Sequence, residues 1–301
     1  MIDLHVHSTA SDGTDTPARL AETGRRLSVM ALTDHDNCDG IDEFSVSCAA
    51  CGAGRLNDIS SAASSVRLAG VEFSVDPGCG YGKFHLLGLG IDARSQRLSD
   101  FCKRILDGRN ARNEKILARF SEIGIKIPLE ELALHARGEV LARPHFAAWL
   151  AEHGYAGDRK EAFERYLVPS SPAPTNCYIT RYRPEPAEAF EVIHSAGGVA
   201  VMAHPRYWTK DPRRLREGLE RLKAAGLDGI EAVYQANEIE ETMDHLRAAK
   251  EIGLCVTAGS DYHGLNKPSI ALGMDVGDEQ RFLEPFFECL ERRRREIRQQ
   301  S

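Results

Sequence analysis

Two histidines lie close to the start of the chain, at His5 and His7, in a stretch that also offers a carboxylate at Asp12. Apolar and polar residues alternate from Ile2 to His7, which is the period-two pattern of a β-strand. On such a strand the two imidazoles project from one face, roughly 6–7 Å apart. Neutral imidazole with carboxylate suits zinc, iron or manganese better than calcium or magnesium. The stretch indicates a transition-metal site, and an exposed edge strand that happens to carry two histidines is the alternative.

More histidines and acids stand where other apolar runs begin or end. Glu72 lies inside an apolar run, where an unpaired carboxylate would be costly. Where strands and helices alternate in a barrel, sites lie at the carboxyl ends of the strands, so we expect these side chains to converge. The further candidate ligands are His35, Glu72, His85, His204, Asp261 and His263. The neighbouring acids Asp34 and Asp36 are expected to orient imidazoles.

The number of candidate ligands predicts more than one ion. A catalytic zinc uses about three protein ligands and one open position. The candidates above therefore suit two or three divalent ions that share carboxylates. Ions about 3.5–4 Å apart lower the pKa of a water molecule between them and neutralise charge on phosphoryl oxygens. The sequence contains no G-x-S-x-G elbow, no P-loop lysine motif and no glycine-rich dinucleotide motif that would indicate a competing chemistry.

Alternating apolar runs and helical patterns are needed to position these residues. After the opening strand, further strands are expected at 29–33, 66–75, 84–91, 199–203, 227–234 and 254–258. Helices are expected at 18–27, 41–51, 99–123, 160–167, 186–196, 213–225, 239–253 and 279–299. A turn over 76–82 predicts that the strands 66–75 and 84–91 form a hairpin. The alternation predicts right-handed crossovers and a largely parallel sheet.

The fold class that follows is α/β, a distorted barrel of about seven βα units with an inserted helical subdomain. The alternation stops between residues 98 and 184, where long charged helical stretches replace it. We therefore expect a discontinuous barrel domain over 1–97 and 185–301, and an inserted subdomain over 98–184. Within the insertion, Arg143 and His145 surround a helix-starting proline.

Composition limits the classes of function. The 301 residues are 42% hydrophobic and 28% charged, as in an ordinary soluble protein. No apolar run approaches the roughly 20 residues of a membrane span, and the start lacks the pattern of a secretory signal, so a cytoplasmic location is expected. The net charge of −7 argues against a broad basic surface for long nucleic acid, but not against a short nucleotide. The eight cysteines are assigned no chemistry, and nothing in the sequence indicates an oligomeric state.

The motifs resemble, in their order, those of the polymerase and histidinol phosphatase (PHP) superfamily. The matching segments are His5-Val6-His7-Ser8-Thr9-Ala10-Ser11-Asp12-Gly13, Thr33-Asp34-His35-Asp36, Gly70-Val71-Glu72, Ala203-His204-Pro205 and Ser260-Asp261-Tyr262-His263-Gly264. The middle portion, with Arg143-Pro144-His145, resembles PHP phosphoesterases that act on nucleoside 3′,5′-bisphosphates, short RNA ends or cyclic nucleotide-like phosphates.

This resemblance implies a distorted (β/α)7 barrel of the PHP type with a trinuclear centre of manganese, iron or zinc. The implied ligands are His5, His7, Glu72 and Asp261 for one ion, Glu72, His85 and His204 for a second, and Asp12, His35 and His263 for the third. The implied nucleophile is a metal-bridging hydroxide held by Glu72, Asp261 and His204. The position of His85 is the least regular, because the spacing from the glutamate to this histidine varies in the family.

Arg143 and His145 are candidates for binding the substrate phosphate, since a guanidinium offers forked donors. An exposed charge beside a proline is the alternative reading. Arg109 and Arg112 fall on an expected helix, either lining a cleft or on a solvated face.

The predicted function is hydrolysis of a phosphate ester in a small nucleotide or sugar phosphate, such as a nucleoside 3′,5′-bisphosphate, AMP or a cyclic phosphate. The alternatives are a 5′–3′ exoribonuclease on short RNA, an amidohydrolase-type C–N hydrolase and a non-catalytic metal domain. The amidohydrolase alternative requires fewer ligands than the motifs supply. A non-catalytic domain would have lost some motif residues, and none of the motifs is broken.

Overall fold

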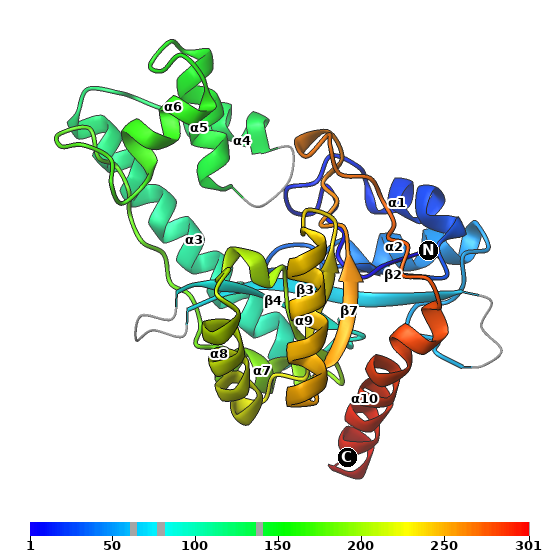
Figure 1. Cartoon of the computed structure of the whole chain (residues 1–301). Helices are drawn as coiled ribbons and strands as arrows, with labels where there is room; N and C mark the ends of the chain where they lie inside the picture. Colours follow the sequence, from blue (N-terminus) through cyan, green and yellow to red (C-terminus); the bar gives the residue numbers. More distant parts are fainter. Residues whose placement is uncertain (61–64, 77–81, 137–140, 301) are drawn as a thin grey trace. The chain divides into compact units, whose positions relative to one another are not determined.

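Seven strands follow one another in chain order around a single sheet in the computed structural model (Figure 1). The structure describes residues 1–60, 65–76, 82–136 and 141–300. The strands are β1 (Ile2–Asp3), β2 (Val29–Leu32), β3 (Val66–Val75), β4 (Phe84–Leu89), β5 (Val199–Met202), β6 (Gly229–Tyr234) and β7 (Cys255–Gly259). Neighbouring strands are parallel except at β4, which is antiparallel to both β3 and β5. The hairpin formed by β3 and β4 is the source of this exception.

The sheet closes on itself because the segments after β1 and β7 pair. Val6 and Tyr262 form a parallel bridge. The backbone N–H of Leu4 donates to the carbonyl of Ala258 at 3.0 Å, and that of His7 donates to the carbonyl of Tyr262 at 2.9 Å. Closure brings the first motif of the chain beside the last one. The expected fold class, a distorted seven-strand α/β barrel, is confirmed.

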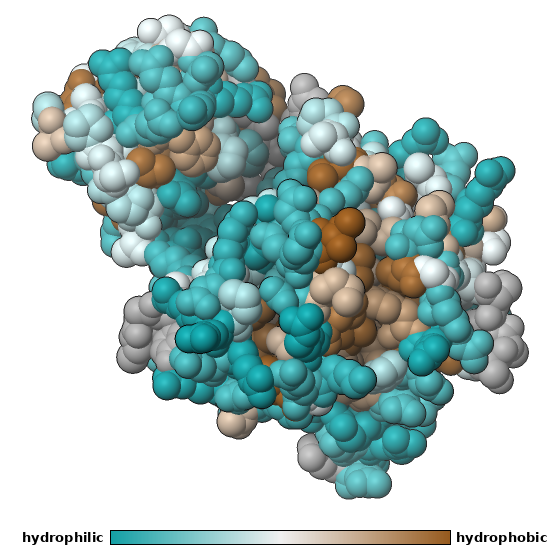
Figure 2. Space-filling view, in the orientation of Figure 1, coloured by the Kyte–Doolittle hydropathy of each residue, from teal (hydrophilic) through white to brown (hydrophobic). Residues whose placement is uncertain are grey.

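Helices connect the strands of the barrel. They are α1 (Pro17–Thr23), α2 (Ile41–Ala50), α7 (Pro186–Ser195), α8 (Pro212–Ala225), α9 (Ile239–Ile252) and α10 (Glu279–Gln300). Short 3-10 turns lie at η1 (Gly24–Arg26), η3 (Pro205–Tyr207) and η4 (Gly264–Asn266). Hydroxyl and carboxylate caps set two of the helix starts: the Thr16 side chain accepts from the N–H of Arg19, and Asp211 accepts from that of Arg213. Figure 2 shows hydrophilic residues over the outer faces of α8 and α9.

Apolar residues of the strands and of α10 form the barrel core. Leu4, Val201 and Ala258 are buried together with Phe286 and Leu290 of α10. The helix therefore packs its apolar side against β5 and β7. Among the described residues, no helix combines the length and the apolar character that a bilayer crossing requires.

The chain forms two compact units, one of Met1–Cys102 with Pro184–Ser301 and one of Lys103–Arg183. The helix α3 (Gln96–Glu122) continues from the first into the second. The second unit also contains α4 (Leu129–Ala136), α5 (Arg143–Glu152), α6 (Arg159–Ala162) and the π-helical turn η2 (Phe163–Leu167). Its own core includes Phe120, Phe146, Trp149, Leu150 and Tyr166.

Most predicted elements are present, with ends that differ by a few residues. The strand expected at 227–234 begins later, at Gly229, and the helix expected at 160–167 is split between α6 and η2. The helices α4 and α5 were not among the expected elements, although the proline of α5 was interpreted as a helix start. The turn expected over 76–82 lies largely outside the described residues.

A buried carboxylate, Asp3, links β1 to the segment that follows β7. Its Oδ1 accepts from the backbone N–H of Ser260 at 3.0 Å and from that of His5 at 3.3 Å. Its Oδ2 accepts from the Ser260 hydroxyl at 2.6 Å and from the N–H of Gly273 at 2.8 Å. Burial raises the pKa of Asp3 to about 6, although hydrogen bonds from Ser260, Gly273 and His5 lower it. The group is therefore an ionised acceptor at pH 8.

The substitution Asp3→Asn should destabilise the barrel at pH 8. An asparagine side chain has only one acceptor oxygen. In either orientation its NH₂ group would therefore face hydrogen-bond donors, either the Ser260 hydroxyl and the N–H of Gly273 or the backbone N–H groups of Ser260 and His5. We expect the free energy of unfolding, measured with urea, to fall by about 2–3 kcal/mol. The control Asp42→Asn changes an exposed acid and should stay within about 0.5 kcal/mol of wild type. Equal stability of the two variants would contradict a closing role for Asp3.

Candidate metal centre

The candidate ligands meet at the ends of strands that are far apart in sequence. Every predicted metal residue belongs to at least one group whose potential ligand atoms lie within 4.8 Å of one another. The groups are His5, His7 and Asp261; His5, Glu72 and His204; His35, Glu72 and His85; and His7, Asp12, His35 and His263. The groups share members, so the residues form one continuous cluster. Their roles as ligands stay a prediction.

The Glu72 carboxylate lies at the centre of this cluster and is fully buried. Nitrogen atoms of several imidazoles lie within 3.4 Å of its two oxygens. Around Oε1 lie His85 Nδ1 at 2.8 Å, His204 Nε2 at 3.2 Å and His5 Nε2 at 3.4 Å; around Oε2 lie His35 Nδ1 at 2.9 Å and His7 Nε2 at 3.2 Å. Each carboxylate oxygen therefore faces its own set of imidazoles, which is the arrangement of a bridging ligand.

Asp261 faces the first two histidines with one oxygen. Its Oδ1 lies 3.6 Å from His5 Nε2 and 3.5 Å from His7 Nε2. The other oxygen, Oδ2, accepts from the Tyr234 hydroxyl at 3.2 Å and from Lys267 Nζ at 2.5 Å. Sequence reasoning did not single out Tyr234 or Lys267, which together hold the carboxylate with Oδ1 turned towards the histidines.

A third part of the cluster forms around Asp12, which is partly exposed. Its Oδ1 lies 3.1 Å from His263 Nε2, and its Oδ2 lies 3.7 Å from His35 Nε2. His85 is also partly exposed. The cluster is therefore open to solvent at Asp12 and His85, while His5, His7 and Glu72 are fully buried.

The electrostatics favour an ionised Glu72 and neutral imidazoles at His7 and His85, which are the protonation states that metal binding requires. Burial opposes charge on Glu72, but the imidazoles of His35, His85 and His5 hold the pKa of its carboxyl well below the usual value. Burial and the charges of His263 and His35 lower the pKa of His7 well below its usual value. Burial is also the main reason that the pKa of His85 is lowered.

His5 differs from its neighbours because a second carboxylate lies behind it. Its Nδ1 lies 3.0 Å from Oε1 of the buried Glu231, whose Oε2 accepts from the backbone N–H of His204 at 2.7 Å. Burial lowers the pKa of His5, but Glu231, Glu72 and Asp261 together raise it well above its usual value. A carboxylate on Nδ1 fixes the proton there and leaves Nε2 available to a metal.

Sequence reasoning missed Glu231, although a signal was present. Like Glu72, it is an acid inside an apolar run, on β6. The glycine at the end of β7 leaves room for it. A Cβ added at Gly259 would lie 2.3 Å from Glu231 Oε1 and 2.4 Å from the Cβ of His5.

Asp34 lies one side chain away from an imidazole, and its expected role in orienting one stays a prediction. Its carboxylate accepts from the backbone N–H of Ser8 at 2.8 Å and from the hydroxyls of Ser8 and Ser11, both at 2.6 Å. The Ser11 hydroxyl in turn lies 3.5 Å from His7 Nδ1. Asp34 therefore shapes the turn after β1 and reaches His7 only through Ser11.

The backbone at two candidate ligands adopts a conformation that residues other than glycine rarely take. The φ angle is +29° at His204 and +59° at Asp261. Such conformations persist where the surrounding structure enforces them, and they are enriched at functional sites. Here each one lies two residues past the end of a strand and directs a side chain into the cluster.

The residues fit divalent transition-metal ions. Within the described part of the chain, Oε2 of Glu72 and Oδ1 of Asp12 are buried, with imidazole nitrogens of His35 and His263 beside them at 2.9 and 3.1 Å. A buried carboxylate requires compensating charge, and cations bound between these oxygens and the imidazoles would supply it. The donor set of imidazole nitrogens and carboxylate oxygens is typical of zinc, iron and manganese.

The two predicted phosphate-binding residues lie in the second compact unit, at the start of α5. Arg143 Nη1 donates to the carbonyl of Leu167 at 3.0 Å, and its guanidinium lies 5.3 Å from the ring centre of Tyr178. His145 is buried, and its Nδ1 accepts from the backbone N–H of Ala142 at 3.0 Å. The structure therefore fixes both side chains, and their contact with substrate stays a prediction.

Known proteins are similar to this chain in sequence and in fold. The model of the PHP domain matches residues 3–126. A 3′,5′-nucleoside bisphosphate phosphatase from Chromobacterium violaceum is 31% identical over 279 residues, which cover 92% of this chain and 90% of that protein. The chain belongs to the PHP family.

Two further comparisons agree with membership of the PHP family. A 5′-3′ exoribonuclease from Haemophilus influenzae is 30% identical over 264 residues, covering 87% of this PHP chain and 89% of that protein. A solved structure from Bifidobacterium adolescentis, of a protein provisionally assigned as a metal-dependent phosphoesterase, matches with a TM-score of 0.75 and 29% identity, covering 97% and 96% of the two chains. The predicted PHP membership and the predicted reaction class, hydrolysis of phosphate esters, are confirmed.

Replacing Glu231 by glutamine should weaken metal binding at the PHP centre. A glutamine has one acceptor oxygen in place of the two carboxylate oxygens of Glu231. Either His5 Nδ1 or the backbone N–H of His204 would therefore face an NH₂ group instead of an acceptor. We expect the affinity for Mn²⁺, measured by calorimetric titration, to fall about 10–100-fold. The control Glu240→Gln changes an exposed acid on α9 and should bind Mn²⁺ like wild type. An unchanged affinity in Glu231→Gln would show that this carboxylate does not support the centre.

Proposed function

We propose that this protein hydrolyses a phosphate monoester of a small nucleotide, with a nucleoside 3′,5′-bisphosphate as the preferred substrate class. The observation that carries the proposal is the cluster around Glu72, in which imidazoles and carboxylates from both ends of the chain share one small volume. The phosphatase from Chromobacterium violaceum, which is similar over nearly the whole chain, supports this substrate class.

We further propose a trinuclear centre of manganese, iron or zinc. Glu72 would be shared by two ions, one also held by His5, His7 and Asp261 and the other by His85 and His204. The third ion would be held by Asp12, His35 and His263. Such ions lower the pKa of water and neutralise charge on phosphoryl oxygens. The grouping of Asp12 with His35 and His263 within 4.8 Å supports the third site.

The chain's own groups have defined tasks in this proposal. Glu72, Asp261 and His204 surround the position at which water is activated for attack on phosphorus. Tyr234 and Lys267 keep Asp261 in place through its Oδ2, and Glu231 keeps the proton of His5 on Nδ1. The partly exposed side of the cluster, at Asp12 and His85, provides the approach for a phosphate group.

We also propose that Arg143 and His145, which lie in the second compact unit, bind an anionic group of the substrate. Arg112 is buried there on α3. Burial, with the positive charges of Arg109, Arg181, Arg143 and Arg183, lowers its pKa to about 9. So many guanidinium groups close together favour a bound phosphate, which accepts several charge-assisted hydrogen bonds at once.

The division into a barrel domain over 1–97 and 185–301 and an inserted subdomain over 98–184 is part of the proposal. The compact unit Lys103–Arg183, with its own apolar core, supports it. The cysteines of the described residues are free thiols, which supports the expected cytoplasmic location, since thiols stay reduced there.

The direct test is release of phosphate from adenosine 3′,5′-bisphosphate with Mn²⁺ added. We expect turnover by wild type and by the control Glu240→Gln, and none measurable with Glu72→Gln, because an amide cannot bridge two cations. Bound Mn²⁺ is counted in each variant. No phosphate release from this compound, from AMP or from cyclic phosphate esters by metal-loaded protein would exclude the proposal.

A short 5′-phosphorylated oligoribonucleotide separates the proposal from its main alternative. The similarity to the exoribonuclease from Haemophilus influenzae favours this second function. Faster cleavage of the oligoribonucleotide than of the mononucleotide bisphosphate, compared by kcat/KM, would make RNA the substrate. The reverse order is expected from the net charge of −7, which disfavours a long polyanion.

The substitution Arg143→Ala should raise KM for adenosine 3′,5′-bisphosphate more than it changes kcat. Loss of charge-assisted hydrogen bonds to a phosphate weakens binding about 10–100-fold. The control Arg119→Ala removes an exposed arginine of α3 and should leave KM unchanged. Because Arg143 also donates to Leu167, thermal unfolding of both variants is measured. A loss of stability with unchanged KM would assign Arg143 a structural role alone.

A further inference from the structure

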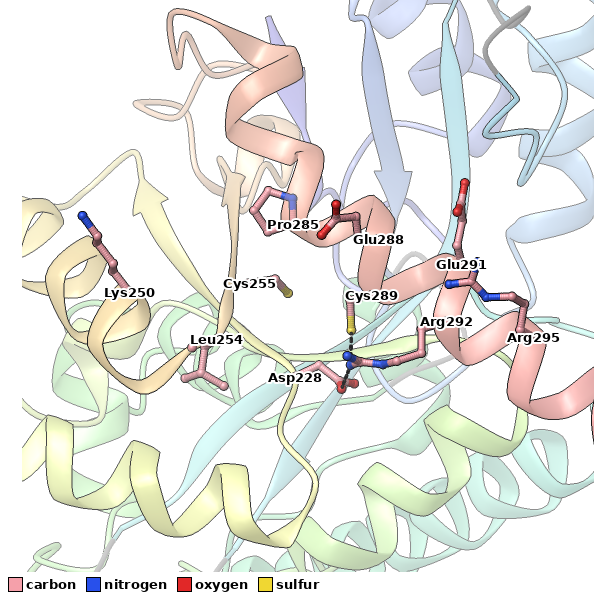
Figure 3. Close-up of a pocket in the computed structure, with 11 residues that line it drawn as sticks. Asp228, Lys250, Leu254, Cys255, Pro285, Glu288, Cys289, Glu291, Arg292 and Arg295 are labelled. Atoms are coloured by element: carbon pink, nitrogen blue, oxygen red, sulfur yellow. Dashed lines mark hydrogen bonds and ion pairs between the residues drawn. The ribbon is translucent and has the colours of Figure 1, made fainter.

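A cavity of about 740 Å³ opens on the barrel unit where β6 and β7 begin. Its walls come from the end of α9, the start of β7 and one side of α10, as Figure 3 shows. Hydrophobic residues show on the surface between α9 and α10 (Figure 2). The candidate ligands Asp261 and His263 follow the opposite end of β7, so this cavity is separate from the metal centre.

Two thiols line this cavity and touch each other. Cys255 is the first residue of β7, and Cys289 lies on α10. Both side chains are buried, with 6% of their surface exposed. The Cys255 thiol interacts with the sulfur of Cys289. A disulfide between them forms when the two sulfurs approach to about 2.05 Å.

An arginine contacts one of the two sulfurs. Nη2 of Arg292 donates to Cys289 Sγ at 3.1 Å, and the same group lies 3.8 Å from Asp228 (Figure 3). The guanidinium therefore contacts the sulfur of Cys289 in particular. The interaction with Cys289, together with burial, raises the pKa of Cys255 well above its usual value. The pair is thus asymmetric, since an arginine contacts the sulfur of Cys289 while Cys255 is kept as a thiol.

We propose that Cys289 and Cys255 are a reversible oxidation site, at which a hydroperoxide that enters the cavity converts the thiol pair to a disulfide. The Cys289 thiolate attacks one peroxide oxygen, the O–O bond breaks, and with one proton taken up the products are a sulfenic acid and water. The sulfur of Cys255 then attacks Cys289, the S–O bond breaks, and the hydroxyl group leaves as water with the Cys255 proton. Two thiols are oxidised by two electrons, and one hydrogen peroxide is reduced to two waters.

The bond would join β7 to the helix that covers the barrel core. Cys255 and Cys289 are members of that core together with Phe286 and Leu290. The disulfide would therefore restrain α10 against the strand that leads to Asp261 and His263. This inference does not depend on the proposed phosphoesterase activity, and its tests need no turnover.

Peptide mapping tests the proposal on the full-length, metal-loaded protein. The reduced protein is exposed to hydrogen peroxide, remaining thiols are alkylated, and the digest is examined by mass spectrometry without reduction. We expect a joined peptide pair containing residues 255 and 289, two hydrogen masses below the sum of its parts and released by dithiothreitol. Absence of this pair at peroxide concentrations that oxidise other cysteines of the chain would overturn the proposal.

Single substitutions then assign the two roles. In Cys255→Ser the sulfenic acid at Cys289 has no resolving thiol, so a dimedone adduct is expected at Cys289. In Cys289→Ser no adduct is expected at Cys255. An adduct at Cys255 instead of Cys289 would overturn the assignment. Thermal unfolding is used to check that each variant is folded. If Cys289→Ser does not fold, the dimedone result for Cys255→Ser by itself decides the assignment.

Substitutions of two arginines on α10 provide a matched pair of variants for measuring the rate of disulfide formation. Arg292→Gln removes the guanidinium on Cys289, and we expect disulfide formation to slow roughly tenfold. Arg295→Gln alters another arginine that lines the same cavity from the same helix, and it should oxidise at the wild-type rate. Equal rates in the two variants would show that Arg292 does not activate Cys289.

Discussion

The buried carboxylate of Glu72 is the constraint on which the rest of the structure depends. It is an acid inside the apolar strand β3, and imidazole nitrogens from several parts of the chain lie within 3.4 Å of its oxygens. A carboxylate removed from water requires compensating positive charge or hydrogen bonds. The histidines supply part of that compensation, and cations bound between the imidazoles and the carboxylate would supply the rest. The barrel must close between β1 and β7 for this arrangement to form, because His7 and Asp261 come from opposite ends of the chain.

A second layer of polar groups keeps the cluster in one arrangement. Glu231 lies behind His5, and Lys267 and Tyr234 hold the far oxygen of Asp261. Asp3 joins the strand that carries the first histidines to the backbone near Asp261. These contacts restrict the rotation of the ligands, so less order has to be gained when an ion binds. The positive φ angles of His204 and Asp261 are tolerated because the same contacts enforce them.

Charged residues are distributed unevenly in this protein, which the net charge of −7 alone does not show. The barrel unit gathers carboxylates and imidazoles that suit cations, while the second unit gathers arginines around Arg112 that suit anions. Cations suit a reacting phosphoryl group, and guanidinium groups suit phosphate oxygens. The thiols of Cys255 and Cys289 belong to neither, since they lie where β7 begins and the metal ligands lie beyond its end.

The sequence by itself determined the alternation of strands and helices, the hairpin of β3 and β4, and the residues that form the cluster, because apolar periodicity and acids or histidines at strand ends are local signals. The resemblance divided the ligands into three sets, whereas in the structure the groups overlap, since His7 lies with Asp12, His35 and His263 as well as with His5 and Asp261. The sequence alone also overlooked Glu231, Tyr234 and Lys267, whose contacts join residues that are distant in the chain. Nothing in the sequence indicated the contact between Cys255 and Cys289 either. Only the tertiary structure decided these pairings, because barrel closure and the packing of α10 bring together groups that no local pattern relates.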